Sequence, residues 1–229
     1  MITGPLRAVP SSCQTRRVEG LPSSDGSRRK RKREDSRRAI IQAGLGVLEE
    51  GGFDALTMAA VAGRAEVSVG SVYNRFADKD KLVVALHVAF VSSLVSEGTQ
   101  AAPEVTGSLA EVLHELVAEH CRLMSSHESL MRVFMHLTAT NVEIKSRAAQ
   151  STRAIGRQFT GRLLAHPHSE IQHPDPAMAA DVCFEMVHDV IARRVARGGT
   201  FESDVELSWG RLGEELTHVC VAYLRAPAR

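Results

Sequence analysis

Two short helical segments joined by a tight turn constrain the fold of this 229-residue chain more than any other feature. Thr57 precedes the run MAAVAGRA and Ser68 precedes VGSVYNRF, and hydroxyl side chains of this kind cap helix N-termini. Apolar residues recur where two crossing helices would bury a shared face, at Ala60, Val61, Val67, Val72 and Phe76. Because longer helical patterns flank the pair, the sequence predicts a helix-turn-helix.

The rest of the chain has helical periodicity as well. A first helix is predicted from about Glu34 to the glycine pair at 51–52. After the short pair, Asp78 caps a longer helix whose apolar residues are Leu82, Leu86, Phe90 and Leu94. Five further helices are predicted at about 109–124, 130–137, 141–165, 176–197 and 205–223. The expected fold is all-α.

Charge is distributed unevenly along the chain. Residues 1–38 hold 11 Lys or Arg and 4 Asp or Glu, a net charge of +7, whereas the remainder has a net charge of −6. Residues 1–33 have few apolar side chains and are predicted to be a disordered basic arm. A polyanion partner at this end and a plain solvated tail are both compatible with that composition. The expected domains are this arm, a helix-turn-helix domain at 34–80 and a helical domain at 81–229.

Several functional classes have no support in the sequence. No run approaches the roughly 18 apolar residues of a membrane span, and no secretory signal is recognisable. The four cysteines are scattered, which is typical of a reduced, cytoplasmic protein. The histidines, including His166, His168 and His173 in one loop, lack the spacing of zinc ligands. We therefore expect no metal site, no cofactor and no catalytic residues.

The segment LTMAAVAGRAEVSVGSVYNRFADKDKLVVAL resembles the DNA-binding region of TetR/AcrR-type transcriptional regulators. The resemblance rests on Thr57, the Val67-Ser68 turn, the run 70–73, Phe76 and the pair 78–79, and at motif level it covers residues 34–95. Two departures stand out. Glu66 occupies a turn position where the family often has glycine, and the apolar Met58 and Ala59 replace polar or basic side chains of some relatives.

The helix that starts after Ser68 is the expected recognition helix. Thr57 and Ser68 place hydroxyls at helix starts, where the helix dipole favours phosphate, and Gly70 and Ser71 are small enough for close approach to DNA. Asn74 is suited to adenine and Arg75 to guanine. The resemblance implies that Tyr73 and Lys79 contact the DNA backbone. The alternatives are core packing for Tyr73 and a surface salt bridge for Arg75.

The resemblance implies that the C-terminal helical domain binds a small ligand and forms a homodimer through its last two helices. Helix faces suggest six ligand-contacting residues: His120, Met124, Phe134, Phe159, Phe184 and His188. The alternative for both histidines is a hydrogen-bonded core position, and for the last two helices it is closure of the monomer core.

The expected function is a cytoplasmic, homodimeric regulator of transcription, more specifically a repressor. It is expected to bind a palindromic operator in double-stranded DNA and to leave it when a small apolar effector binds. Two other functions fit an all-α chain. One is a helical carrier or enzyme that does not bind DNA, and the other is an interaction adaptor without a ligand cavity.

Overall fold

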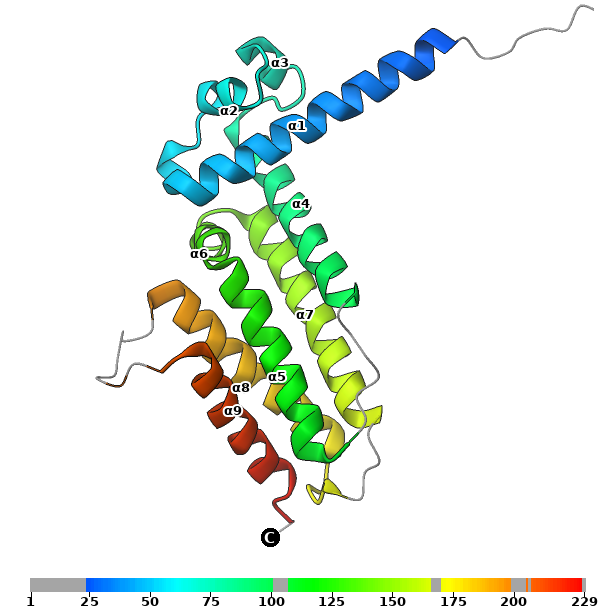
Figure 1. The fold of residues 1–229 in the computed structure, drawn as a ribbon, viewed down its shortest axis with the longest axis vertical. Coiled ribbons are helices and arrows are strands. Elements are labelled where there is room, and N and C mark those ends of the chain that lie inside the picture. The colour runs from blue at the N-terminus through cyan, green and yellow to red at the C-terminus, as the bar shows by residue number, and fades with distance from the viewer. Residues whose placement is uncertain (1–23, 101–106, 166–169, 199–204, 206, 228–229) are drawn as a thin grey trace, which may run out of the picture. The chain divides into compact units, whose positions relative to one another are not determined.

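The computed structural model describes residues 24–100, 107–165, 170–198, 205 and 207–227, and all regular elements among them are helices (Figure 1). Their bounds are α1 (Ser24–Ala55), α2 (Met58–Arg64), α3 (Val69–Tyr73), α4 (Lys79–Gln100), α5 (Leu109–Ser126), α6 (Glu128–Leu137), α7 (Val142–Ala165), α8 (Pro176–Arg197) and α9 (Trp209–Leu224). The all-α fold and the succession of helices expected from the sequence are confirmed.

The chain divides into two compact units, Met1–Ser36 and Arg37–Arg229. In the first unit, residues 24–36 are the N-terminal part of α1, so the expectation of a disordered arm is wrong for residues 24–33. Lysine and arginine are good helix formers, and extending a helix that is already nucleated costs little. Residues 1–23 lie outside the described part of the chain. The described basic side chains of this segment are exposed.

Within the second unit, local signals place the short helices of the head, which we define as residues 37–80. Gly52 leaves the helical region at φ 69° and ψ −167°, and this kink is the predicted end of the first regular helix. Thr57 and Ser68 are the N-caps of α2 and α3, as predicted. The turn between them contains Glu66 at φ 53°, a left-handed conformation that glycine adopts more easily.

The buried core of the head continues beyond residue 80. Its core includes Val61, Val72 and Phe76, and the same cluster of buried side chains contains Phe90 of α4 and Phe134 of α6. Lys81 also forms an ion pair of 3.8 Å with Glu143 at the start of α7. The apolar face of α4 therefore continues from the head into the remainder of the unit, and the domain boundary expected after residue 80 stays a prediction.

The remainder, which we call the body (residues 81–227), packs α5, α7, α8 and α9 around a second core (Figure 1). Helices α5 and α9 lie side by side. The guanidinium of Arg194 on α8 lies 4.4 Å from the ring centroid of Trp209 on α9. The last helix was predicted to include Val205, but Val205 precedes α9 and is 63% exposed. Helix α9 begins after Ser208, because Ser208 caps it by accepting a hydrogen bond from the Arg211 amide at 3.1 Å.

Glu66→Gly tests the backbone conformation of the turn. A left-handed non-glycine residue costs about 1–2 kcal/mol, whereas glycine adds roughly 0.5–1 kcal/mol of conformational entropy to the unfolded chain. We expect the variant to raise the free energy of unfolding in urea by about 0.5–1 kcal/mol. Ala65→Gly is the matched control, because Ala65 has an ordinary φ of −82° and should lose stability. The same change in both variants would contradict the assignment.

Candidate DNA-binding surface and ligand cavity

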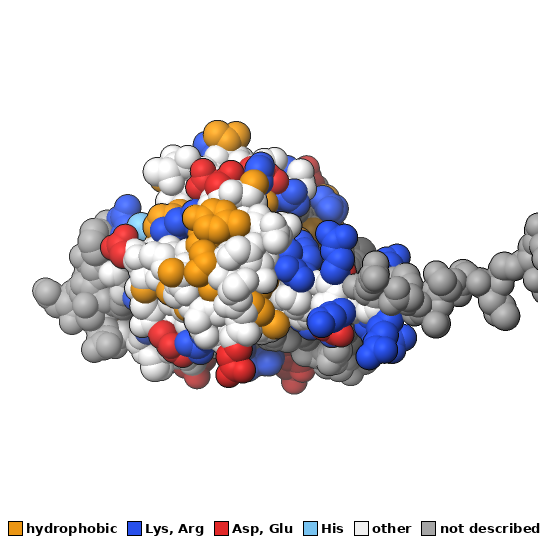
Figure 2. Space-filling model, turned by 90° about the horizontal axis from the view of Figure 1, so that it is seen from above, with side chains coloured by type: hydrophobic (Ala, Val, Ile, Leu, Met, Phe, Trp, Pro, Cys, Tyr) orange, Lys and Arg blue, Asp and Glu red, His pale blue; other side chains and the backbone are white. Residues whose placement is uncertain are grey.

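The predicted recognition helix α3 presents small and polar residues outward. Ser68, Gly70 and Asn74 are exposed, Tyr73 is 52% exposed, and Val72 is fully buried beneath them. Tyr73 is therefore not packed in the core, which was its alternative role. Seen from above, the middle of this face carries uncharged and apolar side chains and backbone (Figure 2). Such a surface can approach the groove edges of a nucleic acid without charge repulsion.

The hydroxyls of Thr57 and Ser68 hold the starts of their helices. Thr57 Oγ1 accepts a hydrogen bond from the Ala60 amide at 3.0 Å, and Ser68 Oγ accepts one from the Ser71 amide at 3.2 Å. The Oγ atoms of Ser68 and Ser71 are also hydrogen-bonded at 2.9 Å. The hydroxyl oxygens of these side chains thus already accept hydrogen bonds within the protein. The bonds made by Ser68 fix the orientation of the short α3.

Gly70 leaves open space on the exposed side of α3. A Cβ atom added there would meet only Ser68 Oγ, at 4.0 Å. Packing within the described residues therefore does not require glycine at this position. The missing side chain therefore matters only for a molecule that approaches α3 from outside the protein, as DNA is expected to approach a recognition helix.

Arg75 and Lys79 are less available for DNA than the sequence suggested. Arg75 is half-buried, its Nη1 donates to the Ser71 carbonyl at 2.9 Å, and its Nε is buried without a partner. This also differs from the surface salt bridge considered as its alternative. Lys79 Nζ donates to the Phe53 carbonyl at 3.2 Å and lies 3.9 Å from the Phe53 ring centroid. Arg75 thus bonds a carbonyl four residues earlier in the chain, whereas tertiary packing gives Lys79 a partner on α1.

An ion pair fixes α2 against α1. Arg64 donates from Nη1 and Nη2 to the two carboxylate oxygens of Glu50, at 2.5 and 2.7 Å. These hydrogen bonds hold the pKa of Glu50 below its usual value and that of Arg64 above it. The pair is exposed, so its main effect is to orient α2, which supports the recognition helix.

A cavity of about 310 Å³ lies in the second unit, bounded by α4, α5, α6, α7 and α8. Five of the six residues proposed from helix faces are on its wall: His120, Met124, Phe134, Phe159 and His188. Most of the wall is apolar. Its polar groups include His87, Thr138, Gln158 and the ion pair in which Arg162 Nη1 donates to Glu119 Oε2 at 2.6 Å.

Phe184, the sixth of these residues, does not line the cavity. Its ring stacks on His188 with centroids 5.5 Å apart and lies 5.6 Å from the ring of Phe159. Gly156 of α7 lets it approach, because a Cβ there would come within 2.8 Å of Phe184 Cε1. Phe184 is therefore a second layer behind the wall. A helix face in the sequence does not distinguish a wall residue from one behind it.

The cavity histidines are uncharged near neutral pH. Burial lowers the pKa of His120 to about 3, and burial also lowers the pKa of His188 and of His87. His120 Nε2 and His188 Nδ1 are hydrogen-bonded at 3.2 Å, so one is the donor and the other the acceptor. Among the described residues, no group of three potential metal ligands gathers here or elsewhere.

His87 was missed by the sequence reasoning, although a signal was present. It lies three residues before Phe90 and seven before Leu94, on the apolar stripe of the same helix. The side chain is 3% exposed and lines the cavity, and its Nδ1 has no hydrogen-bond partner. A buried polar atom without a partner is costly, so His87 is a candidate for contact with a ligand.

Comparisons with known proteins agree with this geometry. Residues 40–86 match the family model of bacterial regulatory proteins of the tetR family, and residues 108–224 match that of the tetracyclin repressor-like C-terminal domain. An HTH-type transcriptional regulator of Mycobacterium tuberculosis, itself described as uncharacterised, is 32% identical over 96 residues. That match covers 42% of this chain and only 45% of the relative.

Solved structures with the same fold are more distant in sequence. A TetR-family regulator from Mesorhizobium loti superposes with a TM-score of 0.66 at 18% identity, over 83% of this chain and 97% of the other. The multidrug binding protein EbrR, solved in complex with malachite green, superposes with a TM-score of 0.55 at 20% identity, over 82% and 97%. At these identities the likeness concerns the fold.

The depressed pKa of His120 makes stability depend on pH. Below pH 6.5 the unfolded chain gains a proton that folded His120 does not accept until about pH 3, so stability falls as pH falls through this window. By pH 5 the loss from this residue is on the order of 2 kcal/mol. We expect His120→Leu to show a smaller loss of unfolding free energy between pH 7 and pH 5. Exposed His218→Leu is the control, and equal pH dependence in both would contradict the prediction.

Proposed function

Because the chain belongs to the TetR family of bacterial regulatory proteins, and is thus a transcriptional regulator with a helix-turn-helix, we propose that it is a repressor released from its operator by a small, mostly apolar effector. Regulators of this family bind DNA and small-molecule effectors and act as dimers. The proposed operator is palindromic, and the proposed location is the cytoplasm, where such DNA lies.

The observation that carries this proposal is a pair of stacked rings. Phe90 and Phe134 have ring centroids 5.4 Å apart, and both line the cavity. Both also belong to the apolar core that contains Val72 and Phe76 beneath the recognition helix. A ligand that displaces either ring therefore disturbs the core of the head directly. A coupling of about 1–3 kcal/mol would weaken DNA binding roughly 5- to 150-fold.

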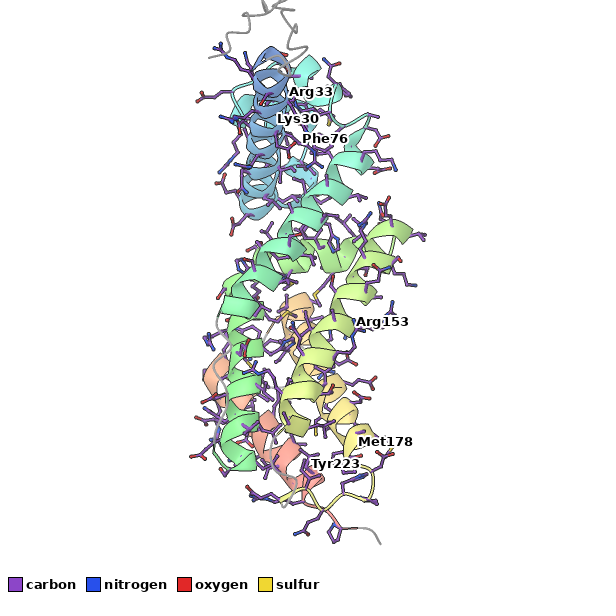
Figure 3. The ribbon with its side chains drawn as sticks, turned by 90° about the vertical axis from the view of Figure 1, so that its right-hand side faces the viewer. Lys30, Arg33, Phe76, Arg153, Met178 and Tyr223 are labelled. Atoms are coloured by element: carbon purple, nitrogen blue, oxygen red, sulfur yellow. The ribbon has the colours of Figure 1, made fainter. Side chains whose placement is uncertain are left out.

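A homodimer is proposed through α8 and α9. Met178 of α8 is 49% exposed and Val219 of α9 is 52% exposed, on helices whose other apolar residues already fill the core of the body (Figure 3). Covering these side chains with a second copy would remove apolar surface from water. A symmetric dimer must place its two recognition helices about 34–36 Å apart to reach successive major grooves.

The alternative is a carrier or enzyme that does not bind DNA. None of the described helices is long and apolar enough to cross a membrane. The cavity histidines are neutral, and two of them, His120 and His188, are hydrogen-bonded to each other. We propose that this arrangement serves ligand binding and not catalysis. Retention of the protein on duplex DNA that weakens with rising salt separates the two functions, because a carrier or enzyme would not be retained.

Asn74→Ala tests direct reading of bases. Asn74 is exposed after the last residue of α3, and a lost base contact should weaken binding by roughly 1–3 kcal/mol on an operator selected from random duplexes. Binding to non-operator DNA should change little. Gln150→Ala, at an exposed position of α7, is the matched control. If Asn74→Ala weakened operator and random DNA equally, the residue would contact only the DNA backbone.

The basic segment of α1 is proposed to add phosphate contacts. Lys30, Arg31, Lys32 and Arg33 are exposed (Lys30 and Arg33 are labelled in Figure 3). Replacing all four with glutamine should reduce the slope of log affinity against log salt by about 0.9 for each lost contact. Arg153→Gln, on the exposed side of α7, controls for the loss of charge (Figure 3). An unchanged slope would mean that the segment does not contact DNA.

A further inference from the structure

The cavity is long and narrow. Helix α7 lines it with Ala148, Thr152, Ile155, Phe159 and Arg162, at helical spacing along one side. Fourteen residues at 1.5 Å each give a length of about 21 Å. A volume of about 310 Å³ spread along that length forms a slot that an extended molecule fills better than a compact one.

The two ends of the slot differ in polarity and exposure. Near the first turn of α7, His87 is 3% exposed and lies edge-on to Phe134, with ring centroids 5.1 Å apart. Burial and then the charge of Arg147, in this part of α7, lower the pKa of His87. At the other end, Gln158 is exposed and the pair Glu119–Arg162 is partly exposed. His87 thus marks the closed end and the ion pair the mouth.

The mouth selects against charged molecules. Glu119 and Arg162 neutralise each other at 2.6 Å. A ligand carboxylate beside Arg162 would lie next to the carboxylate of Glu119, and a ligand ammonium beside Glu119 would lie next to Arg162. Like charges at such distances disfavour the charged form of the ligand. Glu119 and Arg162 are the charged residues on the cavity wall and they pair with each other, so entry of a charged ligand group would cost desolvation.

The closed end requires one hydrogen bond. Nδ1 of His87 is buried without a partner, whereas Nε2, the other ring nitrogen of this cavity-lining residue, is not among the buried atoms that lack one. In a neutral imidazole Nε2 is a donor in one tautomer and an acceptor in the other. A hydroxyl can meet either, because it both donates and accepts.

We propose that the effector is an elongated, uncharged molecule with an apolar body and a hydroxyl-type group that hydrogen-bonds Nε2 of His87. This inference rests on the proposed function, since it names the ligand class of the cavity that the regulator is proposed to use. The apolar body fills the slot along α7. The ion pair at the mouth stays intact and excludes carboxylates and amines of the same length.

Calorimetric titration of the full chain without DNA, at pH 7.5, tests the ligand class. The probes are 1-decanol, decanoic acid, decylamine and the compact bicyclic alcohol decahydro-2-naphthol. We expect 1-decanol to bind at least about tenfold more tightly than each of the other three, the equivalent of one well-made buried polar contact. Equal or tighter binding of the acid, the amine or the bicyclic alcohol would overturn the proposal, and so would binding of none of the probes.

Variants test the role of His87. His87→Leu should lower the affinity for 1-decanol about tenfold, and His87→Gln, which keeps a hydrogen-bonding side chain, should restore most of it. His218→Leu, outside the cavity, should leave the affinity unchanged. Wild-type affinity in a folded His87→Leu variant would overturn the assignment of His87. If that variant does not fold, His87→Phe, which keeps a ring without nitrogen atoms, takes its place, and wild-type affinity for 1-decanol in that variant would overturn the assignment.

The same probes separate this inference from the proposed function. If 1-decanol binds as expected but operator binding is unchanged, the ligand class is correct and the release mechanism is wrong. If a charged or compact molecule releases the operator while 1-decanol does not bind, the release mechanism is correct and the ligand class is wrong.

Discussion

The stacked rings of Phe90 and Phe134 connect the helix-turn-helix to the cavity. Close-packed interiors resist small gradual displacements and tend to change between discrete arrangements. These rings belong to the buried cluster that includes the core of the head, and both also line the cavity. The ion pair between Lys81, directly after the head, and Glu143 adds a contact between the start of α4 and α7. The cluster of buried side chains thus continues from the head into the body.

Much of the fold could be predicted because its signals are local. Caps such as Ser68 and Thr57 determine where a helix begins, and each accepts a hydrogen bond from a backbone amide as expected, from Ser71 at 3.2 Å and from Ala60 at 3.0 Å. Apolar spacing indicated which side of α4 is buried. The basic part of α1 was misjudged, because low apolar content argues against a core but not against a helix that continues an existing one.

The chemistry of the site was harder to predict, because the partner of a side chain depends on tertiary contacts. Lys79 lies beside Asp78 at a helix start, and nothing in the sequence places it over Phe53, 26 residues away. Arg75, which follows α3, makes instead a local contact to the carbonyl of Ser71 in that helix. His87 was passed over because its neighbours are apolar, and that same apolar setting is what leaves its ring nitrogen without a partner.

The contact between Gly156 and Phe184 bears on how such a protein could diverge. Any side chain at position 156 would push against a ring that touches no ligand but supports His188 and Phe159. A single substitution in this second layer would therefore change the width of the slot while every ligand-contacting residue stays the same. New ligand preferences could arise in evolution through positions that an inspection of the cavity wall alone would classify as neutral.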